Sequence, residues 1–367
     1  MGFDVSKQSP PDRRSPVMTD VAAAANVSIA TVDRVLNRRK GVKQRTTQKV
    51  LKAAIELGFL TAEESALIAT PRPPNIVFLL PSGTNPYLRL LGEKLRARAV
   101  PNGRDAPSIR CIFIESFNAR ALATALRHHA AWADGIAFLA IDHPEVREAV
   151  EAIAAGGVRV VTIVSDLPHP GRAGYVGLDN HSVGRTAAML LARFSKRTSG
   201  SLALVSGSRN YRAHSEREAG FLALIEEMYP ELHVVGVREG HDDAGENYRH
   251  ASSLLDQHPD LFGIYNVGGS SNGIARALVE RKRTDDVLFI GHGLTSDTRE
   301  LLINGTMDVV IDSDPDTILT TAINLICTQP DQIQSGRTQR AVRMDVFFRE
   351  NLPSGTSIPA RLSLIHI

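Results

Sequence analysis

Cysteines, tryptophans and long apolar runs are all scarce in this sequence of 367 residues. Its two cysteines, Cys111 and Cys327, lie too far apart along the chain to suggest a disulfide framework or a zinc site. No apolar run approaches the ~18 residues that a membrane-spanning helix requires. We therefore expect two reduced, buried cysteines, no bound metal and no insertion into a membrane.

Motifs for nucleotide cofactors are also missing. No G-x-G-x-x-G opens a helix, and no P-loop lysine follows a glycine-rich turn, so no cofactor is expected. Residues 1–17 are polar and proline-rich and lack the apolar segment of a secretory signal. We interpret them as a disordered tail, and we expect the protein to remain in the cytoplasm.

Charge is distributed unevenly along the chain. Residues 12–60 contain ten Lys or Arg and four acids, which gives this segment a net charge of +6 within a chain of net charge +2. Residues 61–367 then carry −4. A basic N-terminal segment joined to a mildly acidic body is typical of a nucleic-acid-binding head on an ordinary globular body.

The pattern within the basic segment predicts three short helices. Thr19 or Asp20 is expected to cap a first helix that ends at Ala25, and a tight turn follows at Asn26. Ser28 is expected to cap a second helix over residues 29–36. Two helices joined in this way form a helix-turn-helix, which places its second helix in the major groove of DNA.

From Asn75 onward the pattern changes to apolar strands that alternate with amphipathic helices. Strands as apolar as NIVFLLP and VRVVTIVSD, each followed by a helix, indicate parallel sheets covered on both faces. There are too many strands for one small sheet. Two doubly wound subdomains are expected, with a ligand cleft at the carboxyl ends of their strands.

The N-terminal segment resembles the DNA-binding head of the lactose-repressor (LacI/GalR) family, and the body resembles the periplasmic sugar-binding fold attached to that head. The implied fold is an all-α, lambda-repressor-like helix-turn-helix head followed by an α/β core. The residues that carry the resemblance are Asp20-Val21-Ala22, Val27-Ser28, Thr31-Val32, Arg34-Val35-Leu36-Asn37, Val42, Thr46, Val50, Ala53 and Leu57-Gly58-Phe59 in the head, and Asn85-Pro86-Tyr87, Tyr175 to Asn180, Gly184-Arg185, Arg217 to Phe221 and Asn304-Gly305-Thr306 in the body.

The resemblance implies a role for individual head residues. Ile29, Ala30 and Arg34 would contact base edges, since arginine suits the acceptors of guanine and small apolar groups suit the thymine methyl. The residues implied in backbone contacts, which position the helix without reading sequence, are Thr19, Ser28, Asn37, Lys43 and Thr46. Asp33 departs from the family, where a small polar residue is usual, and an acid near phosphates lowers affinity unless it is paired.

The connector after the head implies a hinge helix that enters the minor groove when a dimer binds. Ile68, with Leu67 beside it, stands where the family has a wedging leucine. Glu63 and Glu64 replace the usual helix-starting residues, and carboxylates are unfavourable near a negative groove. An ordinary linker helix is the alternative interpretation.

These patterns predict the following organisation. The tail, residues 1–17, is followed by the head at 18–60, a hinge or linker at 61–74, the core at 75–350 and a C-terminal tail at 351–367. The first subdomain is expected over about 75–178 plus 307–331, and the second over about 179–306 plus 332–350. The crossovers between them would then lie near Asp179, Thr306 and Gln332.

Family positions that hold a polar effector transfer to eight residues of the core. Arg217 is the strongest candidate, because a guanidinium can donate two hydrogen bonds to hydroxyls or to a carboxylate. Val267, Gly293 and Ser313 stand where the family usually has polar or acidic ligand groups. The eight candidates are Asn85, Tyr87, Asp142, Ser165, Asp166, Arg217, Asn266 and His292.

The combined expectation is a transcriptional regulator, acting as a repressor, that is not an enzyme. Its partners would be a pseudo-palindromic operator in double-stranded DNA, a carbohydrate-like effector and a second copy of the chain. Two alternatives remain. A solute-binding protein would have the same body, and Gly269 to Gly273 fits the G-x-S-x-G pattern of a hydrolase with Ser271 as nucleophile.

Overall fold

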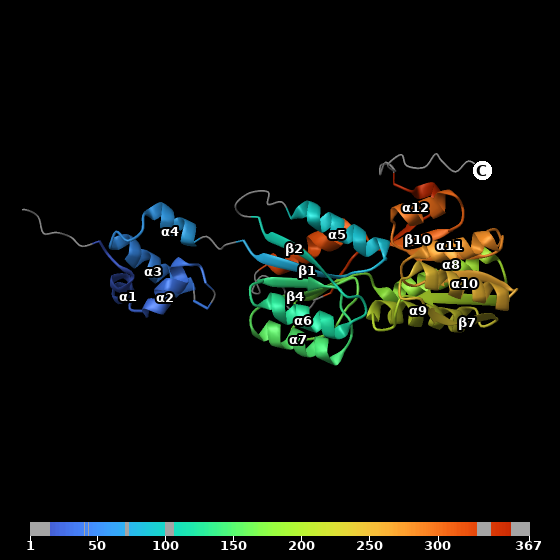
Figure 1. Cartoon of the computed structure of the whole chain (residues 1–367), viewed down its shortest axis with the longest axis horizontal. Coiled ribbons are helices and arrows are strands. Elements are labelled where there is room, and N and C mark those ends of the chain that lie inside the picture. The colour runs from blue at the N-terminus through green and yellow to red at the C-terminus, as the bar shows by residue number, and fades with distance from the viewer. Residues whose placement is uncertain are drawn as a thin grey trace, which may run out of the picture. The chain divides into compact units, whose positions relative to one another are not determined.

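The computed structural model describes residues 15–39, 41–42, 44–69, 73–99, 106–328 and 339–353. The chain divides into two compact units, residues 1–73 and 74–367. The first is helical, and the second contains two six-stranded sheets (Figure 1). No helix among the described residues is both long and apolar enough to cross a membrane.

The head contains the expected helix-turn-helix. Helices α1 (Met18–Ala25), α2 (Ile29–Leu36) and α3 (Gln44–Glu56) enclose a small core that includes Val21, Val32 and Val50. Ser28 caps α2 by accepting a hydrogen bond from Thr31 N at 3.2 Å, as predicted. Asn26 adopts the left-handed conformation that ends α1 and turns the chain.

The start of α1 differs from the prediction. The helix begins at Met18, so Thr19 and Asp20 lie in its first turn and neither is the N-cap residue. Asp20 stabilises the start of the helix from its place in the first turn, because its carboxylate accepts a hydrogen bond from the N–H of Val17 at 2.9 Å. The sequence identified the capping acid but placed the helix boundary too late.

A fourth helix, α4 (Ala62–Ala69), follows the helix-turn-helix. Thr61 and Glu64 form a capping box, in which Thr61 N donates to Glu64 Oε2 at 2.9 Å and Glu64 N donates to Thr61 Oγ1 at 3.1 Å. Ile68 is half-buried against the core of the head. The acid at position 64, unusual for the family, therefore starts this helix.

The two sheets of the core have the same strand order. The first sheet runs β11-β5-β4-β3-β1-β2 and is wholly parallel, whereas the second runs β12-β10-β9-β8-β6-β7, with only β12 antiparallel. The strands of the first sheet are β1 (Asn75–Pro81), β2 (Ser108–Ile114), β3 (Gly135–Phe138), β4 (Arg159–Ile163), β5 (Gly174–Gly177) and β11 (Gln339–Ala341). Those of the second are β6 (Gly200–Ser206), β7 (Leu232–Glu239), β8 (Leu261–Asn266), β9 (Leu288–His292), β10 (Val309–Asp312) and β12 (Asp345–Phe347).

Helices cover both faces of each sheet, because strands such as β1 and β8 are buried on both sides and need apolar partners above and below. In Figure 1, α5 lies on one side of the first sheet and α6 and α7 on the other. The helices of the first subdomain are α5 (Pro86–Arg98), α6 (Ala119–Ala130), α7 (Pro144–Ala155) and α13 (Pro315–Cys327). Those of the second are α8 (Asn180–Ser195), α9 (Arg212–Met228), α10 (Ala244–Gln257), α11 (Ser271–Glu280) and α12 (Ser296–Ile303), and a 3-10 turn, η2, covers Arg349–Asn351.

The chain crosses between subdomains three times, but two crossovers lie later than predicted. β10 pairs with β9, so residues 307–312 belong to the second subdomain and the chain crosses near Ser313, not at Thr306. β11 pairs with β5, so residues 339–341 belong to the first, and the last crossover follows Ala341. Gln332 lies outside the described residues. Apolar strand patterns do not show which sheet a strand joins, which explains both errors.

Helices α8 and α9 pack with their backbones in contact. A methyl group at Gly184 would collide with the backbone of Arg217, and one at Gly220 would collide with the backbone of His181. Two glycines are needed because no side chain fits between these helices. This close crossing fixes the position of α9, the helix that carries Arg217.

Candidate functional site

One face of α2 presents the candidate DNA-reading residues. Ile29, Ala30 and Arg34 are exposed, and Ala30 and Arg34 lie one helical turn apart, while Val32 and Val35 face the core of the head. Ile29 is 49% exposed. Exposed apolar and cationic side chains on one helix have the chemistry that base edges require.

The candidate backbone contacts surround this face. Thr19, Ser28 and Asn37 are exposed, Thr46 is half-buried on α3, and Lys43 lies outside the described residues. Ser28 already caps α2, so its hydroxyl has a structural role as well. The geometry leaves these assignments as predictions from the sequence.

Asp33, the unexpected acid on the same helix, is paired. Its Oδ2 accepts a hydrogen bond from Arg39 Nη1 at 2.8 Å, and its Oδ1 accepts one from Asn37 Nδ2 at 2.7 Å. The carboxylate therefore holds one cation and one amide that would otherwise be available to phosphates. Because Arg39 is well exposed and Asp33 is about one third exposed, the ion pair contributes little stability, about 0–1 kcal/mol.

The hinge prediction has a specific structural complication. Ile68, the expected wedge, packs against the head, and the side chain of Leu67 lies outside the described part of the chain. Entering a groove would require Ile68 to leave this contact. The minor-groove role of both residues therefore stays a prediction.

The core contains a cavity of about 60 Å³ at the carboxyl ends of both sheets. In each sheet the direction in which successive strands are added reverses once, between β1 and β3 in the first sheet and between β6 and β8 in the second. Ligands bind at such points in doubly wound folds. The loops and helix starts that follow these strands supply most of the lining. The polar side chains in the lining are Asn85, Tyr87, Ser165, Tyr211, His214, Arg217, Asp242, His292, Asp312 and Ser313.

Arg217 lies in the cavity wall, 8% exposed. Its Nε donates to Asn180 Oδ1 at 2.8 Å and its Nη1 donates to the carbonyl of Val267 at 2.9 Å. Among the described residues no carboxylate lies within ion-pair distance of this guanidinium, and its Nη2 donates no hydrogen bond. Burying a cation without an anion costs free energy, so we expect a bound ligand to supply a hydrogen-bond acceptor for this guanidinium.

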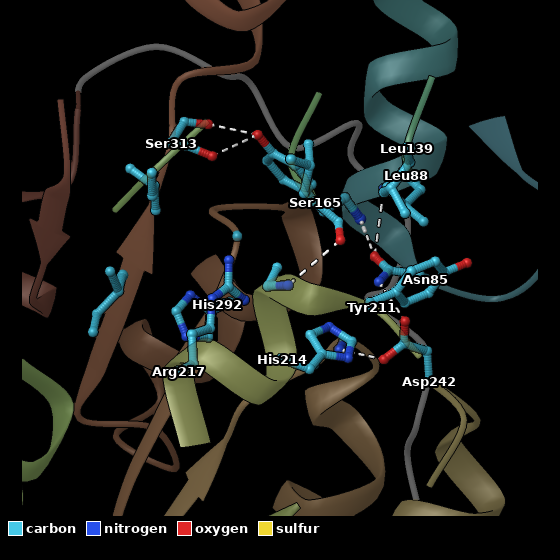
Figure 2. A pocket seen from close by; sticks show the side chains of 18 of the residues that line it. Asn85, Leu88, Leu139, Ser165, Tyr211, His214, Arg217, Asp242, His292 and Ser313 are labelled. Atoms are coloured by element: carbon cyan, nitrogen blue, oxygen red, sulfur yellow. Dashed lines mark hydrogen bonds between the residues drawn. The ribbon is translucent and has the colours of Figure 1, made fainter. Parts of the chain in front are cut away.

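Two buried histidines flank the cavity and are neutral. Burial lowers the pKa of His214 to about 4; the nearby Asp242 carboxylate opposes this shift, and the charge of Arg217 adds to it. Burial and then Arg217 hold the pKa of His292 well below its usual value. Nε2 of His292 lies 2.7 Å from the Tyr265 hydroxyl. Figure 2 shows Arg217 and His292 on one side of the cavity and Asn85, Tyr211 and Asp242 on the other.

Asp242 holds the two sides of the cleft together. The Asn85 amide donates to its Oδ2 at 2.9 Å and the Thr84 hydroxyl donates to its carbonyl at 2.7 Å, so two residues of the first subdomain bind one residue of the second. Gly269 N donates to the other carboxylate oxygen at 2.7 Å. Both His241 and Asp242 have positive φ, and such strain often marks functional positions.

Further contacts close the cleft. Asp142 N donates to the carbonyl of Asn210 at 3.1 Å, and Ala213 N donates to Ser165 Oγ at 3.4 Å. Phe117 places its ring 5.1 Å from that of Tyr211. The structure is therefore a closed form, in which direct bonds between the subdomains surround a small cavity.

Five of the eight candidate effector residues line the cavity: Asn85, Tyr87, Ser165, Arg217 and His292. The other three do not line it, because each side chain is occupied elsewhere. The Asp142 carboxylate pairs with Arg147 at 2.6 Å and that of Asp166 pairs with Arg172 at 2.9 Å. The Asn266 amide donates to Gly269 O and Ser271 Oγ, which shapes the turn after β8.

Four polar residues of the cavity were not identified from the sequence: Tyr211, His214, Asp242 and Asp312. Helix α9, which follows β6, begins at Arg212. Tyr211 and His214 thus lie at the point where the chain leaves the carboxyl end of a strand, and Asp242 follows β7 in the same way. That position in the fold was the available signal.

The departures from the family have visible consequences. A side chain at Gly293 would approach the Tyr87 ring within 3.0 Å, so the space that an acid would occupy is taken by Tyr87. The Tyr87 hydroxyl donates to the Ser313 carbonyl at 2.7 Å. Val267 is fully buried in the apolar core. The three changed positions leave the neighbourhood of Arg217 poor in carboxylates.

The hydrolase alternative gains no support from the geometry around Ser271. The strained residue of this turn is Ser270, with φ 56°, whereas Ser271 is the first residue of α11 and its hydroxyl accepts from Asn266. His292 bonds Tyr265, and His366 lies outside the described residues. Within the described residues no group of three or more His, Cys, Asp or Glu side chains could hold a metal ion.

Family comparisons agree with the two-part architecture. Residues 76–329 match the model described as a periplasmic binding protein domain, and residues 17–62 match that of the bacterial regulatory proteins of the lacI family. The chain belongs to the periplasmic binding protein domain family and carries a LacI-family regulatory domain in front of it.

Curated relatives match this LacI-type protein over short stretches of the chain. It is 34% identical over 80 residues to the HTH-type transcriptional regulator DegA of Bacillus subtilis, covering 22% of this chain and 24% of DegA. It is 40% identical over 68 residues to the sucrose operon repressor of Vibrio alginolyticus, covering 16% of this chain and 72% of that sequence. The match therefore spans about a quarter of DegA.

Solved structures match the core. GanP, a glucose-galactose binding protein from Geobacillus stearothermophilus, superposes with a TM-score of 0.68 at 23% identity over 77% of this chain and 99% of its own. A solute-binding protein of an ABC transporter from Burkholderia graminis, solved with D-arabinose, gives 0.70 at 20% identity over 78% and 99%. At these identities the likeness establishes the fold of the core.

Proposed function

We propose that this protein is a sequence-specific DNA-binding transcriptional regulator, acting as a repressor, whose operator affinity is controlled by a small polar metabolite in the core cleft. The exposed face of α2, with Ile29, Ala30 and Arg34, carries the proposal for DNA. The head is strongly basic and matches a LacI-family model, which supports the same reading. A solute-binding protein for transport would have no use for such a head.

The proposed unit is a homodimer in the cytoplasm. One head buries too little surface for tight binding, whereas two heads related by a two-fold axis read a pseudo-palindrome and multiply specificity. The effector is proposed to be carbohydrate-like, since the closed cleft is lined by hydroxyl, imidazole, carboxylate and guanidinium groups. Opening and closing this cleft would couple to operator affinity by about 1–3 kcal/mol.

Arg34→Ala is the sharpest test of DNA recognition. Binding sites are first selected from random duplexes with the full chain, and affinities are then measured on the selected site and its single-base variants. We expect a loss of about 1–3 kcal/mol on the selected site and relaxed preference at one position per half-site. Lys43→Ala, which is expected to remove a phosphate contact, should weaken all sequences alike and lower the salt dependence.

Equal losses on every sequence for Arg34→Ala would contradict the base-reading role. Failure of the unsubstituted protein to select any duplex at low ionic strength, with or without sugars, would overturn the proposed function itself.

A further inference from the structure

The guanidinium of Arg217, which forms no ion pair with a described residue, indicates the class of effector that the cleft binds. Arg217 is more than nine-tenths buried, lines the cavity and forms no ion pair with a described residue. Its two structural bonds go to neutral acceptors, the Asn180 amide oxygen and the Val267 carbonyl. The positive charge is therefore held in place by the fold but is not neutralised by it.

No described residue around Arg217 forms an ion pair with it. His214 and His292 are neutral, and the carboxylate of Asp242 is already bonded to Asn85 and Gly269. Asp312, the other acid in the lining, accepts from Leu294 N at 3.0 Å, and burial raises its pKa to about 6. The Arg217 end of the cavity thus offers donors and positive charge.

The opposite end has different chemistry. The Asp242 carboxylate accepts one hydrogen bond on each oxygen and has lone pairs left for hydroxyl donors. The Tyr211 hydroxyl is buried, lies near the backbone of Phe117 and bonds no side chain among the described residues. Figure 2 shows these two side chains across the cavity from Arg217. One end therefore suits an anion, and the other suits hydroxyl groups.

We propose that the effector is a polyhydroxy carboxylate, whose carboxylate accepts hydrogen bonds from Arg217 and whose hydroxyls bind at the Asp242 end. This inference rests on the proposed function of the cleft and narrows it from carbohydrates in general to sugar acids. A charge-assisted hydrogen bond to a buried guanidinium is stronger than a bond to a neutral hydroxyl. The acid should therefore bind about 10- to 100-fold more tightly than its neutral counterpart.

The test compares matched ligands on the full-length protein. A panel of alditol–aldonate pairs of four to six carbons is titrated by calorimetry, because the members of each pair differ only in a terminal CH₂OH or carboxylate. Galacturonate and its methyl ester add a pair in which the charge alone is removed. We expect at least one acid to bind, and the neutral member of that pair to bind at least tenfold more weakly.

Arg217→Gln should abolish the preference for that acid and leave weak binding of the neutral partner. Arg212→Gln is the matched control, since Arg212 lies on the same helix, pairs with Glu216 at 2.6 Å and does not line the cavity. It should keep the full preference. If Arg217→Gln does not fold, Arg217→Lys and the ester comparison on the unsubstituted protein decide the question without it.

The outcomes separate the two proposals. A neutral alditol that binds as tightly as its aldonate would overturn the sugar-acid assignment while supporting an effector role for the cleft. A panel with no response from any member would overturn both, while DNA recognition by the head would still be judged by Arg34→Ala. Retention of the acid preference in Arg217→Gln would show that another group reads the charge.

Discussion

The head and the cleft hold their candidate functional residues in opposite ways. In the head, Ile29, Ala30 and Arg34 come from six consecutive residues, are exposed, and are positioned by one capped helix. In the cleft, Asn85, Arg217 and Asp242 come from distant parts of the chain, and Arg217 and Asp242 are buried. The head can therefore change its recognition residues with little effect on stability, whereas in the cleft binding and folding depend on the same bonds.

The largest expected effect tests whether the head and the core fold independently of each other. Gly184→Leu places a side chain where α8 meets the backbone of α9, so we expect loss of more than about 4 kcal/mol and an unfolded core. Trp132, the only tryptophan in the sequence, reports on the core by fluorescence. Hydrogen exchange should show the helices of the head still protected.

Gly156→Ala is the control for this substitution. Gly156 ends α7 with φ −74°, which any residue adopts, and the added methyl meets Ile153 O at 3.3 Å and Ala152 O at 3.6 Å, with no severe overlap. We expect a change within about 1 kcal/mol. If Gly184→Leu lost hydrogen-exchange protection in the head as well as in the core, the two units would not fold independently.

The second prediction concerns the pH dependence of the cleft. Burial raises the pKa of Asp312 from 3.8 to about 6, so its contribution to stability is present below about pH 4 and is lost as the pH rises through 6. Asp312→Asn keeps an acceptor for Leu294 N and removes the charge. Urea unfolding should show similar stabilities at pH 4 and a more stable variant at pH 7, by roughly 3 kcal/mol.

Asp314→Asn provides the opposite trend. Burial disfavours the charge of Asp314, but hydrogen bonds from Thr317 outweigh it and lower the pKa. This variant should lose stability relative to the unsubstituted protein as the pH rises from 3 to 7. Parallel pH profiles for the two variants would contradict the assigned environments.

The same contrast explains what could be predicted from the sequence. The residues of α2 and its cap at Ser28 were correctly bounded, because helix caps and helical periodicity are local signals. The alternation of strands and helices likewise indicated two parallel sheets. Which sheet β10 and β11 join depends on pairing with strands far away in the sequence, and no local pattern records that choice.

The cleft shows the limit of transferring residues one at a time. Asp142 and Asp166 stand in the expected loops, yet Arg147 and Arg172 bind their carboxylates. The sequence contains these arginines, but it does not show that they fold back onto the acids. Asp242 faces the cavity because its backbone adopts a left-handed conformation. Non-glycine residues rarely adopt that conformation, so no sequence pattern indicated this residue.

The third prediction tests how locally the reading helix is stabilised. Ser28→Ala removes the cap of α2 and should destabilise the head by about 1 kcal/mol, with no effect on the core. Hydrogen exchange of α2 in the full chain should accelerate about fivefold where opening limits exchange. Thr19→Ala, on the exposed side of α1, is the control and should leave these rates nearly unchanged.

The smallest effect is expected at Asp33. Asp33→Ser removes the carboxylate that binds Arg39 and Asn37, so Arg39 becomes available to phosphates and one negative charge leaves the proposed interface, while the Asn37 amide can still donate to the backbone carbonyl at position 33. DNA affinity should rise about three- to fivefold on every sequence, and the salt dependence should steepen by about one phosphate contact. The double variant Asp33→Ser with Arg39→Ala should lose this gain if Arg39 supplies the new contact.

The base preference should stay as in the unsubstituted protein, because Asp33 acts through its neighbours. An altered preference at one base pair would instead mean that Asp33 accepts a hydrogen bond from cytosine, and the acid would then belong to the reading face.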